Sequence, residues 1–137
     1  THTDHTGNNL ASQKSLERYA AGMKRGFLFA NFIDFDMLYG HRRDAQGYAD
    51  CLVQTDAWLA SFLPTLGKDD VLIVTADHGN DPTWKGTDHT REIVPLLVFR
   101  PGHPGVSLGV RNGFYDVAQS AAHYFGIEPL PRGVSFL

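Results

Sequence analysis

The amino-acid sequence predicts an α/β fold with a largely parallel sheet. Short, nearly continuous apolar runs, typical of strands buried on both faces, alternate along the chain with stretches that carry the apolar stripe of an amphipathic helix. Glycine, proline and other turn residues separate these stretches. Strands and helices that alternate in this way form layered folds in which helices cover a mostly parallel sheet.

The first half of the chain holds three predicted elements. Residues 12–24 carry an apolar side chain at every third or fourth position, which predicts an amphipathic helix that Gly26 brings to an end. The apolar run 27–33 predicts a buried strand. A second helix is predicted over 44–63, with Asp44 as its N-cap.

Three more elements follow in the second half. The apolar runs 71–76 and 94–99 predict two strands, and residues 115–125 predict a helix that ends at Gly126. Three strands make a small sheet for an α/β protein, so its edges would be exposed. Bare sheet edges are places where a second copy of the chain can pair, which leaves self-association open.

The composition narrows the class of protein. The 137 residues are enough for one domain core, and 42% hydrophobic with 20% charged residues is a globular balance. A net charge of −3 gives no electrostatic reason to expect nucleic acid or a membrane surface as partner. No apolar run approaches the roughly 20 residues that span a bilayer, and the first residues lack the pattern of a signal peptide. We therefore expect a cytoplasmic protein, with Cys51 as a buried thiol.

Carboxylate and imidazole side chains gather where two predicted strands end. The candidate metal ligands are Asp36, His41, Asp77, His78 and His89. If the two strands are parallel, their carboxyl ends meet at one edge of the sheet and the following loops converge. Mixed carboxylate and imidazole ligands suit Mn²⁺, Zn²⁺ or Fe²⁺ better than Ca²⁺. Five ligands leave room for two metal ions about 3.5–4 Å apart, an arrangement that clamps a phosphoryl group during transfer.

Each of these residues, taken alone, has a structural interpretation. An Asp-His pair is common and is explained equally well by a helix cap or a hydrogen-bonded loop. Asp34 is better read as a backbone-bonded turn residue than as a ligand. Arg42 and Arg43 fit a phosphate grip, but also a solvated cluster of ion pairs. Trp58 and Trp84 are read as packing residues. What favours metal binding is the joint placement of all five candidates at strand ends.

Three motifs resemble those of the prokaryotic phosphopentomutases, which are alkaline-phosphatase-like metalloenzymes. The motifs are DMLYGHRRD at 36–44, TADHGNDP at 75–82 and GTDHTRE at 86–92. The resemblance runs from about Gly26 to the last residue, and the first two motifs are specific in combination. It implies the C-terminal part of a three-layer α/β/α core.

The resemblance also implies an activity and its cofactors. Phosphopentomutases interconvert ribose 1-phosphate and ribose 5-phosphate, and the deoxyribose pair, by phosphoryl transfer through a phosphothreonine, a sugar bisphosphate and two Mn²⁺ ions. The protein would thus be an isomerase with a sugar-phosphate substrate. Position by position, Asp77 and His78 match ligands of one metal, whereas Asp36, His41 and His89 match ligands of the other.

The chain also departs from the family. The first metal of a phosphopentomutase needs an aspartate near the N-terminus and the nucleophilic threonine, and both precede a cap domain that grips the substrate. None of the threonines here matches that nucleophile, Thr75, Thr87 and Thr90 included, so no catalytic residue is assigned. We expect residues 1–137 to be a single partial domain that lacks the N-terminal core segment and the cap. Such a chain would be inactive as a mutase by itself.

Three other interpretations remain open. Cofactor-independent phosphoglycerate mutases share the Ala-Asp-His-Gly-Asn sequence, but they have a shorter loop after the first metal aspartate. They also place their last histidine farther than the 11 positions that separate His78 from His89. A non-catalytic metal-binding module with a degenerate site is the alternative from a different class, although Asp36, His41 and His89 are all retained. A phosphatase of the same superfamily is a third reading.

Overall fold

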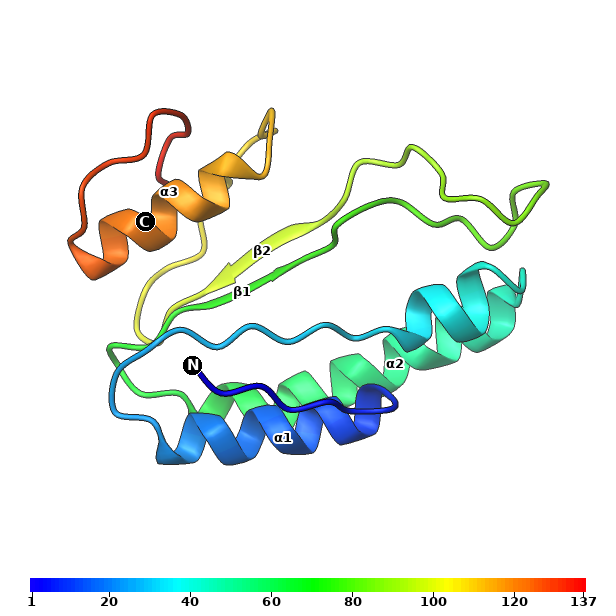
Figure 1. Ribbon diagram of the computed structural model, residues 1–137, viewed down its shortest axis with the longest axis horizontal. Coiled ribbons are helices and arrows are strands. Elements are labelled where there is room, and N and C mark those ends of the chain that lie inside the picture. The colour runs from blue at the N-terminus through cyan, green and yellow to red at the C-terminus, as the bar shows by residue number, and fades with distance from the viewer. The chain divides into compact units, whose positions relative to one another are not determined.

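The computed structural model describes residues 1–137 as two compact units, Thr1–His103 and Pro104–Leu137. The elements, labelled in Figure 1, are α1 (Asn9–Gly22), η1 (Phe35–Gly40), α2 (Ala45–Phe62), η2 (Leu63–Thr65), β1 (Leu72–Thr75), β2 (Leu96–Phe99) and α3 (Tyr115–Phe125). The α/β class is therefore confirmed. No helix has both the length and the apolar character needed to cross a membrane.

Capping side chains set the starts of the first two helices. The carboxylate of Asp44 accepts a hydrogen bond from the backbone N–H of Gly47 at 2.9 Å, which confirms the predicted N-cap of α2. Helix α1 begins three residues before the predicted start because Asn8 caps it in the same way, through the N–H of Ala11. The helix ends at Gly22, before the predicted end, because the backbone of Met23 is extended.

The last helix ends at Gly126, as predicted. Gly126 follows α3 with φ 67°, and its N–H bonds back to the carbonyl of His123 at 3.1 Å. We expect Gly126→Ala to lower the free energy of unfolding by about 1 kcal/mol, because a Cβ disfavours this backbone region. Urea unfolding checks this. The matched control, Gly22→Ala at the open end of α1, should leave stability equal or slightly higher.

The sheet differs from the prediction. Its two strands, β1 and β2, pair antiparallel, with Leu72 opposite Phe99 and Thr75 opposite Leu96. No helix lies between these strands, and without a crossover the returning chain pairs antiparallel. The expected strand 27–33 is extended and runs in the same direction as β1 in Figure 1, but it joins no ladder.

A small aromatic core lies in the first unit. The ring of Trp58 stacks on Phe62 at 4.9 Å and meets the edge of Phe32 at 5.4 Å, while its indole N–H donates to Glu17 at 2.8 Å. Trp58 is thus a packing residue, as predicted. Cys51 is buried too, with 6% of its surface exposed, and burial raises the pKa of its thiol.

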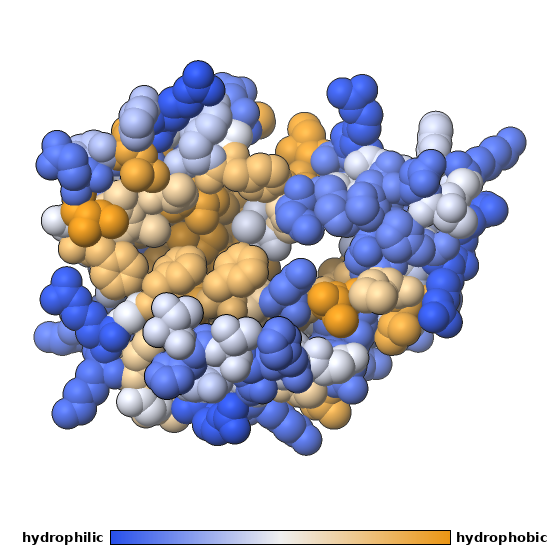
Figure 2. Space-filling view, in the orientation of Figure 1, coloured by the Kyte–Doolittle hydropathy of each residue, from blue (hydrophilic) through white to orange (hydrophobic).

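Apolar side chains remain on the surface of the same unit. Phe29 is 82% exposed within the extended segment, and Phe27 and Leu97 are exposed as well. Figure 2 shows apolar side chains gathered on the visible surface. Residues 27–33 therefore have the composition of a buried strand. They pair with no neighbouring strand, however, and much of their apolar surface is exposed.

Candidate metal centre

Three potential ligand atoms converge in the first unit. One each from Asp36, His78 and His89 lie within 4.8 Å of one another. Asp36 comes from η1, His78 follows β1, and His89 lies in the loop that returns to β2. Residues distant in the sequence thus supply one oxygen and two nitrogen donors to a single point, a donor set that fits a divalent transition metal.

A single β-bridge brings the two histidines together. Gly79 and Thr90 pair antiparallel, with the N–H of Thr90 donating to the carbonyl of Gly79 at 3.0 Å. Because side chains alternate between the faces of a strand, the neighbours of this pair, His78, Asn80 and His89, share the opposite face. The imidazoles of His78 and His89 accordingly stack, with ring centroids 3.6 Å apart.

The bridge requires glycine at position 79. A Cβ there would lie 2.7 Å from the carbonyl oxygen of Thr90 and 2.8 Å from the backbone nitrogen of Glu92. The hydroxyl of Thr90 reinforces the closure, because it accepts the N–H of Asp81 at 2.7 Å and donates to the carboxylate of Glu92. The loop that carries His89 is therefore closed at its base by backbone and side-chain bonds.

The carboxylate of Asp36 lies at the centre of the cluster. Its Oδ2 is 3.2 Å from Nε2 of His41, and its Oδ1 is 3.3 Å from Nε2 of His89. The side-chain amide of Asn80 also donates to Oδ1. The other ring nitrogen of His41, Nδ1, contacts the backbone carbonyl oxygen of Thr87. One partly exposed carboxylate thus faces two imidazoles and an amide.

The structure brings four of the five predicted ligands together. Asp36, His78 and His89 converge, and His41 contacts the same carboxylate. Asp77 is not among the three converging ligands: its side chain is 79% exposed, although its Oδ1 lies 3.7 Å from Nε2 of the neighbouring His78. Because His78 lies with Asp36 and His89, proximity does not reproduce the two ligand sets implied by the resemblance. That division stays a prediction.

Other predicted residues have the following places. Asp34 accepts a hydrogen bond from the backbone N–H of Asn9 at 2.8 Å, at the start of α1, so its structural interpretation is confirmed. Arg42 and Arg43 are exposed, and Arg43 has a left-handed backbone with φ 57°. The packing role expected of Trp84 is wrong, because its side chain is 64% exposed on the loop surface.

Sequence reasoning missed Asn80 and Gly40. Asn80 was visible only as part of a motif, and its contact with Asp36 depends on the bridge register, which no local pattern reveals. Gly40 is buried against the Asn80 amide. The loop between β1 and β2 also contains Asp81, whose pKa is lowered by hydrogen bonds from the hydroxyl and N–H of Thr83.

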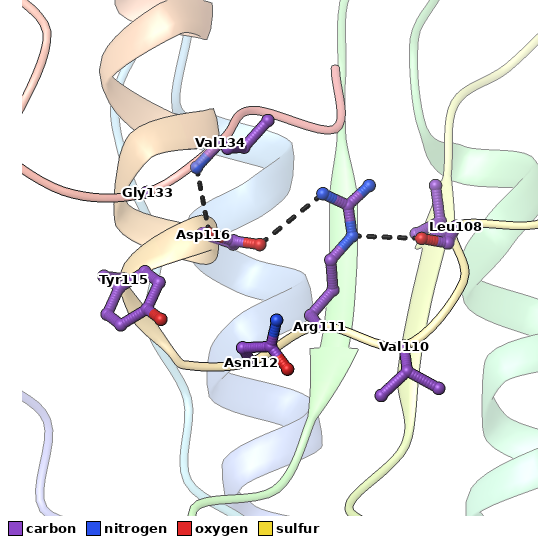
Figure 3. A pocket seen from close by; sticks show the side chains of 8 residues that line it. All are labelled: Leu108, Val110, Arg111, Asn112, Tyr115, Asp116, Gly133 and Val134. Atoms are coloured by element: carbon purple, nitrogen blue, oxygen red, sulfur yellow. Dashed lines mark hydrogen bonds and ion pairs between the residues drawn. The ribbon is translucent and has the colours of Figure 1, made fainter.

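An open cavity of about 430 Å³ occurs separately, in the second unit. Figure 3 shows that its polar side chains face one another: Arg111 reaches Asp116 at 3.5 Å and donates to the carbonyl of Leu108 at 3.0 Å. Asp116 also accepts the N–H of Val134 at 2.9 Å. These groups fasten the C-terminal residues to α3, and they gather no set of metal ligands.

Comparison with known proteins identifies the family. Residues 2–129 match the Metalloenzyme superfamily. The chain belongs to this superfamily. Membership in a superfamily of metalloenzymes implies a metal cofactor, which agrees with the oxygen and nitrogen donors at Asp36, His78 and His89.

Curated relatives are similar over most of the chain. It is 50% identical over 132 residues to the phosphopentomutase of Shewanella loihica, a match that covers 96% of this chain and 33% of the relative. It is 57% identical over 110 residues to the phosphopentomutase of Shewanella baltica strain OS155, covering 80% and 27%. The chain thus spans about a third of the length of the relatives it matches.

Proposed function

We propose that these residues form the metal-binding C-terminal part of a phosphopentomutase. The whole enzyme would interconvert ribose 1-phosphate and ribose 5-phosphate, and the deoxyribose pair, in the cytoplasm. The observation that carries the proposal is the convergence of Asp36, His78 and His89. It occurs in a chain that is 50% identical to a relative named phosphopentomutase.

The metal proposed is Mn²⁺, with two ions in the complete enzyme. Asp36, His41 and His89 would hold one ion, and Asp77 and His78 would contribute to the other. When bound, the ions would lower the pKa of a nucleophilic hydroxyl and neutralise charge on the transferred phosphoryl group. The second set fits less closely here, since the side chain of Asp77 is 79% exposed and is not among the converging ligands.

The chain's own residues prepare the site. The Gly79–Thr90 bridge holds His78 and His89 side by side, so little ordering remains to be done when a ligand arrives. Both imidazoles must be neutral to donate a lone pair, which makes binding weaker at acidic pH. Asp36 supplies the negative charge that favours a cation over water at this point.

The other groups that the reaction needs would come from outside these motifs. Other parts of the enzyme would supply the phosphothreonine nucleophile, one further aspartate ligand and the cap that grips the sugar phosphate. The extended segment that carries the exposed Phe27 and Phe29 would pair with further strands in the three-layer core, whose sheet would be largely parallel. Alternatively, a second copy of the chain would pair with the same segment, so that the protein self-associates.

The purified 137-residue chain is expected to show no mutase activity. Without the nucleophile no phosphoryl group can be accepted, whatever the metal occupancy. The assay follows conversion of ribose 1-phosphate with Mn²⁺ present, beside the full-length Shewanella loihica enzyme. Turnover by the chain alone would contradict the expectation.

A chimera tests the function itself. Residues of this chain would replace the matching third of the Shewanella loihica protein. We expect the chimera to convert ribose 1-phosphate and not 3-phosphoglycerate, and the same chimera with Asp36→Ala to be inactive. Activity on 3-phosphoglycerate alone would support the phosphoglycerate mutase alternative. Metal binding in a folded chimera without either activity would support a non-catalytic module.

A further inference from the structure

Asn80 contacts the central carboxylate of the cluster without being a candidate ligand. Its side-chain amide donates to Oδ1 of Asp36, the oxygen that also lies 3.3 Å from His89. The other oxygen, Oδ2, faces His41 at 3.2 Å. The two oxygens therefore have different partners, and the carboxylate is held in one orientation.

The β-bridge explains how Asn80 reaches this position. Continuing its register by one residue from Gly79 and Thr90 sets Asn80 directly opposite His89, on the face that meets Asp36. Amide and imidazole thus approach the same oxygen from neighbouring strands. An amide is suited to this place because it donates a hydrogen bond and carries no charge that would compete for a cation.

We propose that Asn80 is a positioning residue that orients Asp36 for metal binding, and that Gly40 keeps the space in which its amide lies. The inference rests on the proposed function in that it takes Asp36 as a metal ligand. By occupying one lone pair of Oδ1, the amide determines which lone pairs of the carboxylate remain for the ion. Groups that orient a ligand in this way tune the affinity of metal sites.

Gly40 is the second observation behind the proposal. A Cβ on this buried glycine would lie 2.2 Å from Nδ2 and 2.5 Å from Cγ of Asn80. Gly40 stands four residues after Asp36 in η1, so both face the same side of the turn. Its backbone is not left-handed. Glycine is needed here for room and not for conformation, so alanine would displace the amide without straining the chain.

The test measures Mn²⁺ affinity by isothermal titration in the 137-residue chain and its variants. Asn80→Leu keeps the branched shape of the side chain but removes the donor, and Gly40→Ala displaces the donor. Each is expected to weaken binding about 10- to 100-fold. The double variant should bind no more weakly than Asn80→Leu, because both changes remove the same hydrogen bond. Asn31→Ala, at an exposed asparagine of the extended segment, should bind like the unchanged chain.

A metal-free measurement separates positioning from general stability. In the unchanged chain we expect one side-chain amide proton of Asn80 to resonate downfield in the NMR spectrum. Gly40→Ala should return it to the ordinary range while the far-ultraviolet circular dichroism stays the same. Equal Mn²⁺ affinity in the unchanged chain and Asn80→Leu would overturn the positioning role alone. A complete lack of binding by the unchanged chain would instead contradict the proposed metal site.

Discussion

Replacing Asp36 by alanine is expected to weaken Mn²⁺ binding by more than about 100-fold. Loss of groups that merely orient a ligand already reduces metal affinity by about 10- to 100-fold, and Asp36 supplies the only carboxylate among the three converging side chains. Its removal would also leave His41 and His89 without their shared partner. Both the charge and the geometry of the site would be lost.

Equilibrium dialysis or titration calorimetry measures this effect. His89→Ala should weaken binding in the same direction, because it removes a nitrogen donor from the same point. The matched control is Asp88→Ala, which removes an exposed carboxylate from the adjacent position and should leave the affinity unchanged. Binding that persists at full strength in both Asp36→Ala and His89→Ala would rule out the proposed ligands.

The second large effect is expected from Gly79→Ala. The added Cβ would meet backbone atoms of Thr90 and Glu92, at 2.7 and 2.8 Å, and these cannot move without opening the bridge. Overpacking of this kind typically lowers the free energy of unfolding by about 1–3 kcal/mol. Opening the bridge would also separate His78 from His89, so metal affinity should fall together with stability.

Urea unfolding and Mn²⁺ titration of the same samples check both parts. Gly7→Ala is the control, because a Cβ at that glycine meets nothing within 4 Å. The control should match the unchanged chain in both measurements. If Gly79→Ala also matched it, the bridge would not be what holds the two histidines together.

Local signals in the sequence predicted the helices well. The N-cap at Asp44 and the helix end at Gly126 depend on immediate neighbours in the sequence, and both are found as predicted. The strands depended on more than local pattern. Residues 27–33 have the composition of a buried strand, but a ladder needs a partner, and the nearest strands pair with each other instead. Whether the two sheet strands run parallel was likewise decided by the connection between them.

The candidate site was predictable in part for the same reason. Placement at the ends of apolar runs was enough to select Asp36, His78 and His89. Asp77 belongs to the same motif as His78, yet its side chain is 79% exposed and it is not among the three converging ligands. Asn80 was overlooked because its contact arises from the register of one bridge and from the room left by Gly40. Both are properties of the folded chain.

The most direct test of a metal centre at this cluster is crystallographic. A crystal of the chain soaked with Mn²⁺ would be measured near the manganese absorption edge, and an anomalous difference map would locate the ion. We expect a peak at bonding distance from the carboxylate of Asp36 and the imidazole of His89. A map with Mn²⁺ bound elsewhere, and no peak among Asp36, His78 and His89, would contradict the assignment.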